Sequence, residues 1–263
     1  MIATFIRRNR YGHQTYFHDR HIKRVAMTAP VLQRYLDDQY LIKNPTWQAE
    51  DSPWKSGLVA DLLNRCKISP SRIADVGCGA GGVLEGLRFA FPDADLFGFD
   101  VAPSAARFWS RPQLSGINFQ RVDFLTETSA SFDLILLLDV IEHIANPFDF
   151  LSRLRPRSRH FVFHIPLDLS AFSVLRETPL IRQRRNVGHI HYFTKQLALA
   201  LVEESGFEVI DASYTGAFSC SPQRNWRTRL AQIPRRAARL LHVDWGVRLL
   251  GGETLLILSR AAD

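Results

Sequence analysis

The residues with the clearest chemical potential lie between positions 73 and 82. Residues 73–76 (IADV) read as a short buried strand, and a glycine-rich turn over residues 77–82 (GCGAGG) follows it. Glycine lets the backbone approach a ligand closely and adopt positive φ where a side chain would clash. Residues 83–90 then have helical spacing, so this stretch predicts the strand, turn and helix start that bind a nucleotide-like ligand.

The glycine motif alone is compatible with two kinds of cofactor. The turn fits the dinucleotide fingerprint GxGxxG and also the shorter pattern GxGxG. Asp75 separates these interpretations, because a carboxylate at the mouth of the strand would repel a pyrophosphate and attract an ammonium group, such as the methionine end of S-adenosylmethionine. Asp100 ends the next apolar run and suits ribose hydroxyls, which both cofactors carry, so it supports a nucleoside without choosing between them.

Composition limits the class of protein. The chain has 263 residues, 46% of them hydrophobic, which allows one large α/β domain. No apolar run reaches the length of a bilayer span, the first residues do not resemble a signal peptide, and three scattered cysteines form no disulfide framework or metal set, so we expect a cytoplasmic protein. The net charge is +7. No basic stretch is interleaved with aromatic residues, so nucleic acid is not favoured as a partner.

Apolar runs alternate with helical spacing along the chain, which predicts an α/β fold with a doubly wound, mostly parallel sheet and helices on both faces. Ligands bind such sheets at the carboxyl ends of the strands, where Asp75, Asp100, Asp123 and Asp139 all fall. Strands are expected over residues 73–76, 96–100, 117–123, 132–140, 159–166, 207–214 and 254–259, and helices over residues 54–65, 102–110, 147–155 and 195–205.

Two regions are expected along the chain: an N-terminal basic segment over residues 1–45 and a domain over residues 46–263. The first reads as a surface or partly disordered segment with a short helix near residues 31–41. Within the domain, residues 167–193 form a candidate lid, and residues 216–250 an Arg-rich insertion with a helix from about residue 225 to 241. The helix after Ser52 and Pro53 either packs Trp54 into the core or covers the cofactor mouth, with Lys55 near a carboxylate.

These motifs together resemble class I S-adenosylmethionine-dependent methyltransferases, and most nearly the small-molecule group that includes the ubiquinone-pathway O-methyltransferases. The resemblance rests on residues 75–81 (DVGCGAG), Asp100, residues 123–124, residues 132–136 and residues 139–144 (DVIEHI). Residues 188–209 are similar to a GHxxFF…E.GF segment of the same group. The family implies a seven-stranded, Rossmann-like sheet whose last strand runs antiparallel between the fifth and the sixth.

The resemblance also implies a set of cofactor contacts. The methionine part would meet Asp75 and the glycine turn, the ribose would meet Asp100, and the adenine would meet Val101 and the acid after the third strand. The full implied set is Asp75, Gly77, Cys78, Gly79, Asp100, Val101, Asp123, Phe124, Leu138 and Asp139. The cofactor itself carries the reactive methyl group.

Methylation of a hydroxyl requires a base to remove its proton. His189, on a loop that the fold places over the site, and His143, after the fourth strand, are the catalytic candidates. His164 lies inside an apolar strand and reads as a core residue, and His191 is a weaker candidate. Glu142 and His143 resemble a metal-binding pair of some quinone-pathway relatives, but two ligands do not make a site, so no metal is predicted.

The expected function is methyl transfer to a small-molecule acceptor, such as a hydroxyl of a sugar, phenol or secondary metabolite. Two alternatives remain: an NAD- or nucleotide-binding Rossmann oxidoreductase, and a non-catalytic S-adenosylmethionine-binding partner protein. Arg235, Arg236 and Arg239 fall near one face of the expected helix in the insertion. That face is either a solvated surface or a contact with an anionic membrane or a lipid-linked substrate.

Overall fold

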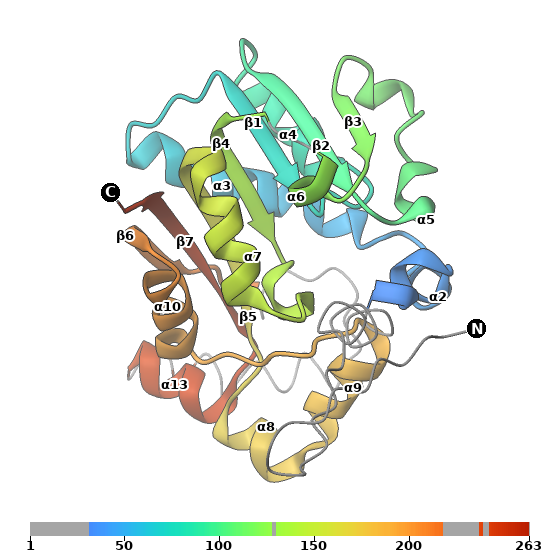
Figure 1. Cartoon of the computed structure of the whole chain (residues 1–263). Coiled ribbons are helices and arrows are strands. Elements are labelled where there is room, and N and C mark those ends of the chain that lie inside the picture. The colour runs from blue at the N-terminus through green and yellow to red at the C-terminus, as the bar shows by residue number, and fades with distance from the viewer. Residues whose placement is uncertain (1–31, 128–129, 218–236, 239–241, 263) are drawn as a thin grey trace, which may run out of the picture.

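The protein is described by a computed structural model over residues 32–127, 130–217, 237–238 and 242–262. A seven-stranded sheet lies between two layers of helices (Figure 1), and its strand order is β3-β2-β1-β4-β5-β7-β6. β7 pairs antiparallel with both β5 and β6, and the other neighbours pair in parallel. The predicted fold class and the antiparallel position of the last strand are therefore confirmed. The strands are β1 (Arg72–Val76), β2 (Asp95–Asp100), β3 (Asn118–Arg121), β4 (Phe132–Leu138), β5 (Ser158–Leu167), β6 (Phe207–Tyr214) and β7 (Glu253–Ala261).

The helices cover both faces of the sheet, because the central strands are apolar on both sides. α3 and α4 pack with one face, and α7, α10 and α13 pack with the other. The helices are α2 (Gln39–Lys43), α3 (Ser52–Arg65), α4 (Gly82–Ala90), α5 (Pro103–Ala106), α6 (Phe124–Glu127), α7 (Pro147–Leu154), α8 (Ala171–Arg176), α9 (Thr178–Asn186), α10 (Lys195–Glu204) and α13 (Val243–Leu250). Short 3-10 turns are η1 (Ala49–Asp51), η2 (Pro112–Leu114), η3 (Ile141–His143) and η4 (Arg155–Arg157).

Helix ends follow local sequence signals. The Asn146 side chain accepts a hydrogen bond from the Asp149 amide at the start of α7, where Pro147 occupies the first turn. Thr194 caps α10 in the same way, by accepting from the Leu197 amide. Ser52, by contrast, is the first residue of α3 and does not cap it.

Several predicted boundaries differ from the structure. The helix expected near residues 31–41 is two short helices, residues 32–36 and α2, separated where Asp38 adopts a φ of 62°. The helix expected over residues 102–110 stops at the end of α5, and β3 and β4 are shorter than predicted. The candidate lid folds as α8 and α9. Most of the expected helix over residues 225–241, including Arg235, Arg236 and Arg239, lies outside the described residues.

The sheet has its switch point between β1 and β4, where the strand order changes direction. A crevice for ligands forms outside the carboxyl ends of the strands at such a point. In Figure 1 the arrowheads of β1, β2 and β4 point toward the side of the molecule that carries α2 and α9. This edge of the sheet is therefore the place to examine for a site. None of the described helices is both long enough and apolar enough to cross a bilayer.

Candidate active site

Asp75 lies near the carboxyl end of β1 and is buried. Its burial, together with the negative charge of Asp100, raises the pKa of the Asp75 carboxyl to about 7, although Lys55 opposes the shift. A carboxylate held in this state gains most from a cationic partner, because a positive charge offsets the cost of burying the negative one. Asp75 therefore favours an ammonium group at the switch point and disfavours a pyrophosphate.

The glycines of the turn differ in backbone conformation. Gly77, Gly79 and Gly81 adopt φ values of 83°, 51° and 79°. Gly82 is instead a helical residue at the start of α4, where it lies against Ser52. The three residues with left-handed backbone are those of the pattern GxGxG, and Gly82 takes part in close helix packing instead.

Asp100 anchors the turn from the end of β2. Its two carboxylate oxygens accept hydrogen bonds from the Gly79 amide at 2.9 Å and from the Ala102 amide at 2.8 Å. The Trp47 ring covers Gly79 so closely that a Cβ added there would come within 3.2 Å of it, and Tyr40 packs on Trp47 with ring centroids 4.7 Å apart. Asp100 therefore binds the turn on one side, and the rings of Trp47 and Tyr40 cover it on the other.

Asp139 follows β4 with a left-handed φ of 56°. One carboxylate oxygen lies 2.6 Å from the Lys55 ammonium, and the other lies 2.7 Å from His164 Nδ1. Burial alone would raise the pKa of Asp139, but the charges of His164 and Lys55 and the hydrogen bonds to both hold that pKa well below its usual range. The expected position of Lys55 near a carboxylate is thus found, and the Trp54 ring packs edge-on against His164.

A buried cluster lies just beyond Asp139. Glu142 is 1% exposed, and neither of its carboxylate oxygens has a hydrogen-bond partner among the described residues. His143 Nε2 lies 3.9 Å and His189 Nε2 lies 3.8 Å from Glu142 Oε1. Burial, followed by the charge of Asp139, raises the pKa of Glu142 well above its usual range, and burial with the charge of His189 lowers the pKa of His143 to about 4.

The loop that carries His189 is fixed to η3 by its backbone. The Glu142 carbonyl accepts hydrogen bonds from the amides of Ile190 at 2.9 Å and His191 at 3.2 Å. His189 Nδ1 in turn lies 2.5 Å from Asp168 Oδ2, just after β5. The two catalytic candidates named from the sequence are thereby brought together, with imidazole centroids 5.0 Å apart.

Glu142, His143 and His189 form a donor set that fits a divalent cation. Each offers one ligand atom, and these atoms all lie within 4.8 Å of one another. Two imidazoles and a carboxylate are ligands that transition metals accept. The unpartnered oxygens of Glu142 are consistent with a cationic partner, because a buried carboxylate without one is costly. His189, which the sequence could not join to the pair at residues 142 and 143, is the third member of this donor set.

The remaining residues of the predicted site differ in their burial and contacts. The Phe124 ring packs 4.9 Å from the Phe99 ring in the core, and Cys78 is buried with a pKa that burial raises. Asp123 is exposed and accepts a hydrogen bond from the Leu125 amide at 3.0 Å. Val101 and Leu138 lie at the ends of β2 and β4, as expected. Their roles toward a cofactor stay predictions.

Two site residues were not identified from the sequence. Asp168 follows β5 as Asp139 follows β4, so the rule that found four acids at strand ends could have found a fifth. Tyr35 lies in the segment that was expected to be a surface region, and its hydroxyl is 2.9 Å from His143 Nδ1. No local pattern in the sequence signals that contact.

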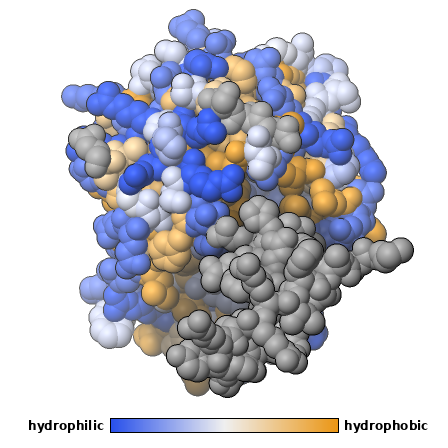
Figure 2. Space-filling view, viewed as in Figure 1, coloured by the Kyte–Doolittle hydropathy of each residue, from blue (hydrophilic) through white to orange (hydrophobic). Residues whose placement is uncertain are grey.

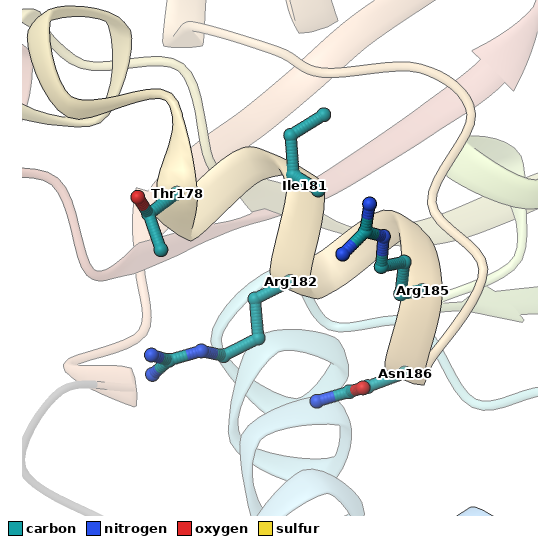
Figure 3. Close-up of a pocket in the computed structure, with 5 residues that line it drawn as sticks. All are labelled: Thr178, Ile181, Arg182, Arg185 and Asn186. Carbon is teal, nitrogen blue, oxygen red and sulfur yellow. The ribbon is translucent and has the colours of Figure 1, made fainter.

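A cavity of about 300 Å³ lies elsewhere, along α9 (Figure 3). Its described lining comes from that one helix: Thr178, Ile181, Arg182, Arg185 and Asn186. None of these residues belongs to the strand ends, the glycine turn or the Glu142 cluster.

The fold and the site indicate a class of protein, and comparison with known sequences identifies the family. The chain belongs to the methyltransferase family whose model, described as "Methyltransferase domain", matches residues 53–212. The predicted family is thus confirmed, and the alternative of an NAD-dependent oxidoreductase is excluded.

Curated relatives are similar over part of their length. A ubiquinone biosynthesis O-methyltransferase of Xylella fastidiosa (strain 9a5c) is 34% identical over 121 residues, which cover 42% of this chain and 48% of the relative. A trans-aconitate 2-methyltransferase of Methylobacterium nodulans is 37% identical over 65 residues, or 24% of this chain and 25% of the relative. The chain spans about half the length of the ubiquinone biosynthesis relatives it matches.

Solved structures share the fold over nearly the whole chain. The plantazolicin methyltransferase BpumL in complex with S-adenosylhomocysteine has a TM-score of 0.59 at 18% identity, covering 92% of this chain and 98% of that one. The N-methyltransferase NodS of Bradyrhizobium japonicum, also with S-adenosylhomocysteine, has a TM-score of 0.52 at 19% identity, covering 90% and 99%. The ligand in both is the product that S-adenosylmethionine leaves after methyl transfer, which agrees with the predicted cofactor.

Proposed function

We propose that the protein transfers the methyl group of S-adenosylmethionine to a hydroxyl of a small acceptor, with His189 as general base. The observation that carries the proposal is the 2.5 Å hydrogen bond between His189 Nδ1 and Asp168. A carboxylate at Nδ1 keeps the proton on that nitrogen and leaves the Nε2 lone pair free to accept another. His189 Nε2 faces the Glu142 cluster beyond β4, at the sheet edge where ligands bind in this fold.

The reaction is a displacement at the methyl carbon. The bond from the acceptor oxygen to that carbon forms while the sulfur–carbon bond breaks, and the acceptor proton passes to His189 Nε2. Asp75 binds the cofactor's ammonium group, and Asp100 accepts hydrogen bonds from the ribose hydroxyls. The protein's contribution is to place the two reacting atoms in line and to remove the proton.

The same cluster supports a second way to activate the hydroxyl. Glu142, His143 and His189 would hold a divalent cation, and such an ion lowers the pKa of a hydroxyl bound to it. In that arrangement the three side chains act as ligands, and Asp168 orients His189 from its other nitrogen. The products of the transfer are the same.

The names of the relatives support an oxygen acceptor of small size. The ubiquinone biosynthesis enzymes are O-methyltransferases by name, and trans-aconitate is a small organic acid. NodS is an N-methyltransferase by name. The base at residue 189 favours oxygen, because an uncharged amine can attack a sulfonium methyl group before it loses a proton.

We further propose that the surface formed by α8 and α13 contacts an anionic membrane. Leu175 of α8 is 85% exposed and Trp245 of α13 is 58% exposed, and the two helices pack together. Arg176 and Arg248 lie over aromatic rings of the same surface. Figure 2 shows hydrophobic residues among hydrophilic ones at its lower left, where Figure 1 places α10 and α13. Exposed apolar residues beside arginines are typical of surfaces that bind anionic lipid.

An acceptor screen tests the proposed reaction. The purified protein is incubated with S-adenosylmethionine and a panel of phenols, sugars, carboxylic acids and amines, and both S-adenosylhomocysteine and the methylated product are detected. We expect a hydroxyl compound to be methylated and His189→Gln to lower kcat by about 100- to 10,000-fold. His160→Gln, at the opposite end of β5, is the matched control. Methylation of amines alone, or cofactor binding without turnover of any acceptor, would refute the proposal.

A further inference from the structure

Residues 32–51 lie against the candidate site, and we call them the N-terminal strap. It precedes the residues that match the methyltransferase family model, which begin at residue 53. Family membership therefore assigns no role to it. The strap contains Tyr35, whose hydroxyl contacts a residue of the buried Glu142 cluster.

Hydrogen bonds and an ion pair fix the strap in position. Arg34 and Lys43 donate to the carbonyls of Arg184 at 2.9 Å and Arg185 at 2.5 Å, in the last turn of α9. Cations are favourable at that end of a helix, where backbone carbonyls have no partner within the helix. Elsewhere in the strap, Asp38 pairs with Arg107 at 2.8 Å. The strap is thus attached both to α9 and to the residue that follows α5.

The Tyr35 hydroxyl makes two contacts but has only one hydrogen. It donates to the Val187 carbonyl at 3.2 Å, and it lies 2.9 Å from His143 Nδ1. A carbonyl can only accept, so the hydrogen of Tyr35 is used there. With that hydrogen directed to Val187, His143 Nδ1 is the donor in the second bond. Burial, with the neighbouring Tyr40, raises the pKa of Tyr35 above its usual range, so the hydroxyl stays protonated.

We infer that Tyr35 is a positioning residue, which holds the proton of neutral His143 on Nδ1 and so presents the Nε2 lone pair to Glu142 and His189. The hydrogen bonds made by the two ring nitrogens of a neutral histidine determine which of them carries the proton. His143 Nε2 lies 3.9 Å from Glu142 Oε1. With a bare Nε2, His143 can accept a hydrogen bond or ligate a cation there, whereas an N–H at this position could do neither.

The backbone at Gly188 leaves room for the contact between Tyr35 and His143. Gly188 has a φ of 95°, and a Cβ added there would lie 3.0 Å from the Tyr35 hydroxyl oxygen. A side chain at this position would push the strap away from His143. Gly188 also immediately precedes His189, so one turn serves both the strap and the second histidine of the cluster.

This inference rests on the proposed function only for its effect on catalysis, because the tautomer of His143 can be measured directly. Long-range proton–nitrogen correlation spectra of protein labelled with ¹⁵N-histidine report which ring nitrogen carries hydrogen. The His143 signal is assigned by its loss in His143→Gln. We expect the wild-type protein to show hydrogen on Nδ1, and Tyr35→Phe to shift it wholly or partly to Nε2.

Tyr192→Phe is the matched control, because it removes one hydroxyl that donates to the Leu180 carbonyl of α9 at 3.1 Å instead of bonding to a histidine. It should leave the His143 tautomer unchanged. Hydrogen on Nε2 in the wild-type protein would overturn the inference without need of any variant, and so would an unchanged signal in folded Tyr35→Phe. If methyl transfer is also found, Tyr35→Phe should lower kcat by about 10-fold and leave KM for S-adenosylmethionine unchanged. Absence of methyl transfer would refute the proposed function and leave the spectroscopic test valid.

Discussion

The Lys55 ammonium lies 2.6 Å from the Asp139 carboxylate, and this partly buried ion pair joins the first turn of α3 to the end of β4. Asp139 is therefore neutralised by its own chain, and its second oxygen is taken by His164. Asp75 is buried at the same edge, and there Lys55 opposes the rise of its pKa without preventing it. Of these two carboxylates, Asp75 is the one left to receive a cationic ligand.

Removal of Lys55 should strongly destabilise the protein. Lys55→Met leaves the partly buried Asp139 carboxylate with one partner fewer. Breaking a fully buried pair costs about 3–5 kcal/mol of the free energy of unfolding, which is an upper limit for this partly exposed pair. We expect a large fall in Tm for the single variant. The double variant Lys55→Met with Asp139→Asn should recover part of the loss, because no unpaired charge remains. Denaturant unfolding of all four proteins gives the coupling energy, and additive losses would contradict this account of the pair.

Asp75→Asn should stabilise the ligand-free protein at neutral pH. The pKa of Asp75 is about 7 in the folded protein and about 4 when unfolded. The folded state therefore binds the proton more tightly, so its stability is full below about pH 4 and falls as pH rises toward 7. Three pKa units correspond to about 4 kcal/mol as an upper limit. Asparagine cannot ionise, so the variant should lose this part of the pH dependence of unfolding.

The same substitution should weaken cofactor binding, because the ammonium group loses its carboxylate. We expect calorimetry with S-adenosylhomocysteine to show an affinity at least about 10-fold lower for Asp75→Asn. Wild-type affinity should also fall as pH drops from about 8 to about 5.5, because the carboxyl takes up a proton. Asp95→Asn, at the opposite end of β2, serves as control. A variant that is more stable and binds the cofactor as well as the wild type would show that Asp75 does not meet the ammonium.

The fold and the cofactor-binding edge could be predicted because they depend on local patterns. Alternating apolar runs marked the strands, and the acids at the ends of four strands marked one edge of the sheet. The Glu142 cluster depends instead on a tertiary contact: the Glu142 carbonyl holds the loop of His189, and no spacing in the sequence encodes that contact. The strap was predicted to be a surface region because its composition is polar. Composition does not show that Tyr35 points toward His143.

Substitution of Glu142 should distinguish the two ways of activating the acceptor. If the cluster holds a cation, calorimetry with Mn²⁺ or Zn²⁺ should detect one site per chain, and Glu142→Gln should weaken it more than about 10-fold. Chelator treatment should then abolish methyl transfer, and added cation should restore it. Asp149→Asn, an exposed acid on α7, is the control. Full activity after chelation, with no cation bound by the wild-type protein, would leave His189 as the base and remove the metal from the proposal.

Membrane contact through α8 and α13 should depend on their exposed apolar residues. Leu175→Ser removes the most exposed of them without changing charge or the buried Ser173 that anchors α8. We expect wild-type protein to sediment with vesicles rich in phosphatidylserine but not with neutral ones, and the variant to bind severalfold less. Phe89→Ser is the matched control, because Phe89 is 82% exposed on α4, outside this surface. Equal losses for both variants would mean that binding follows general surface hydrophobicity. Absence of vesicle binding together with concentration-dependent dimerisation that Leu175→Ser disrupts would assign the surface to a second copy of the chain instead.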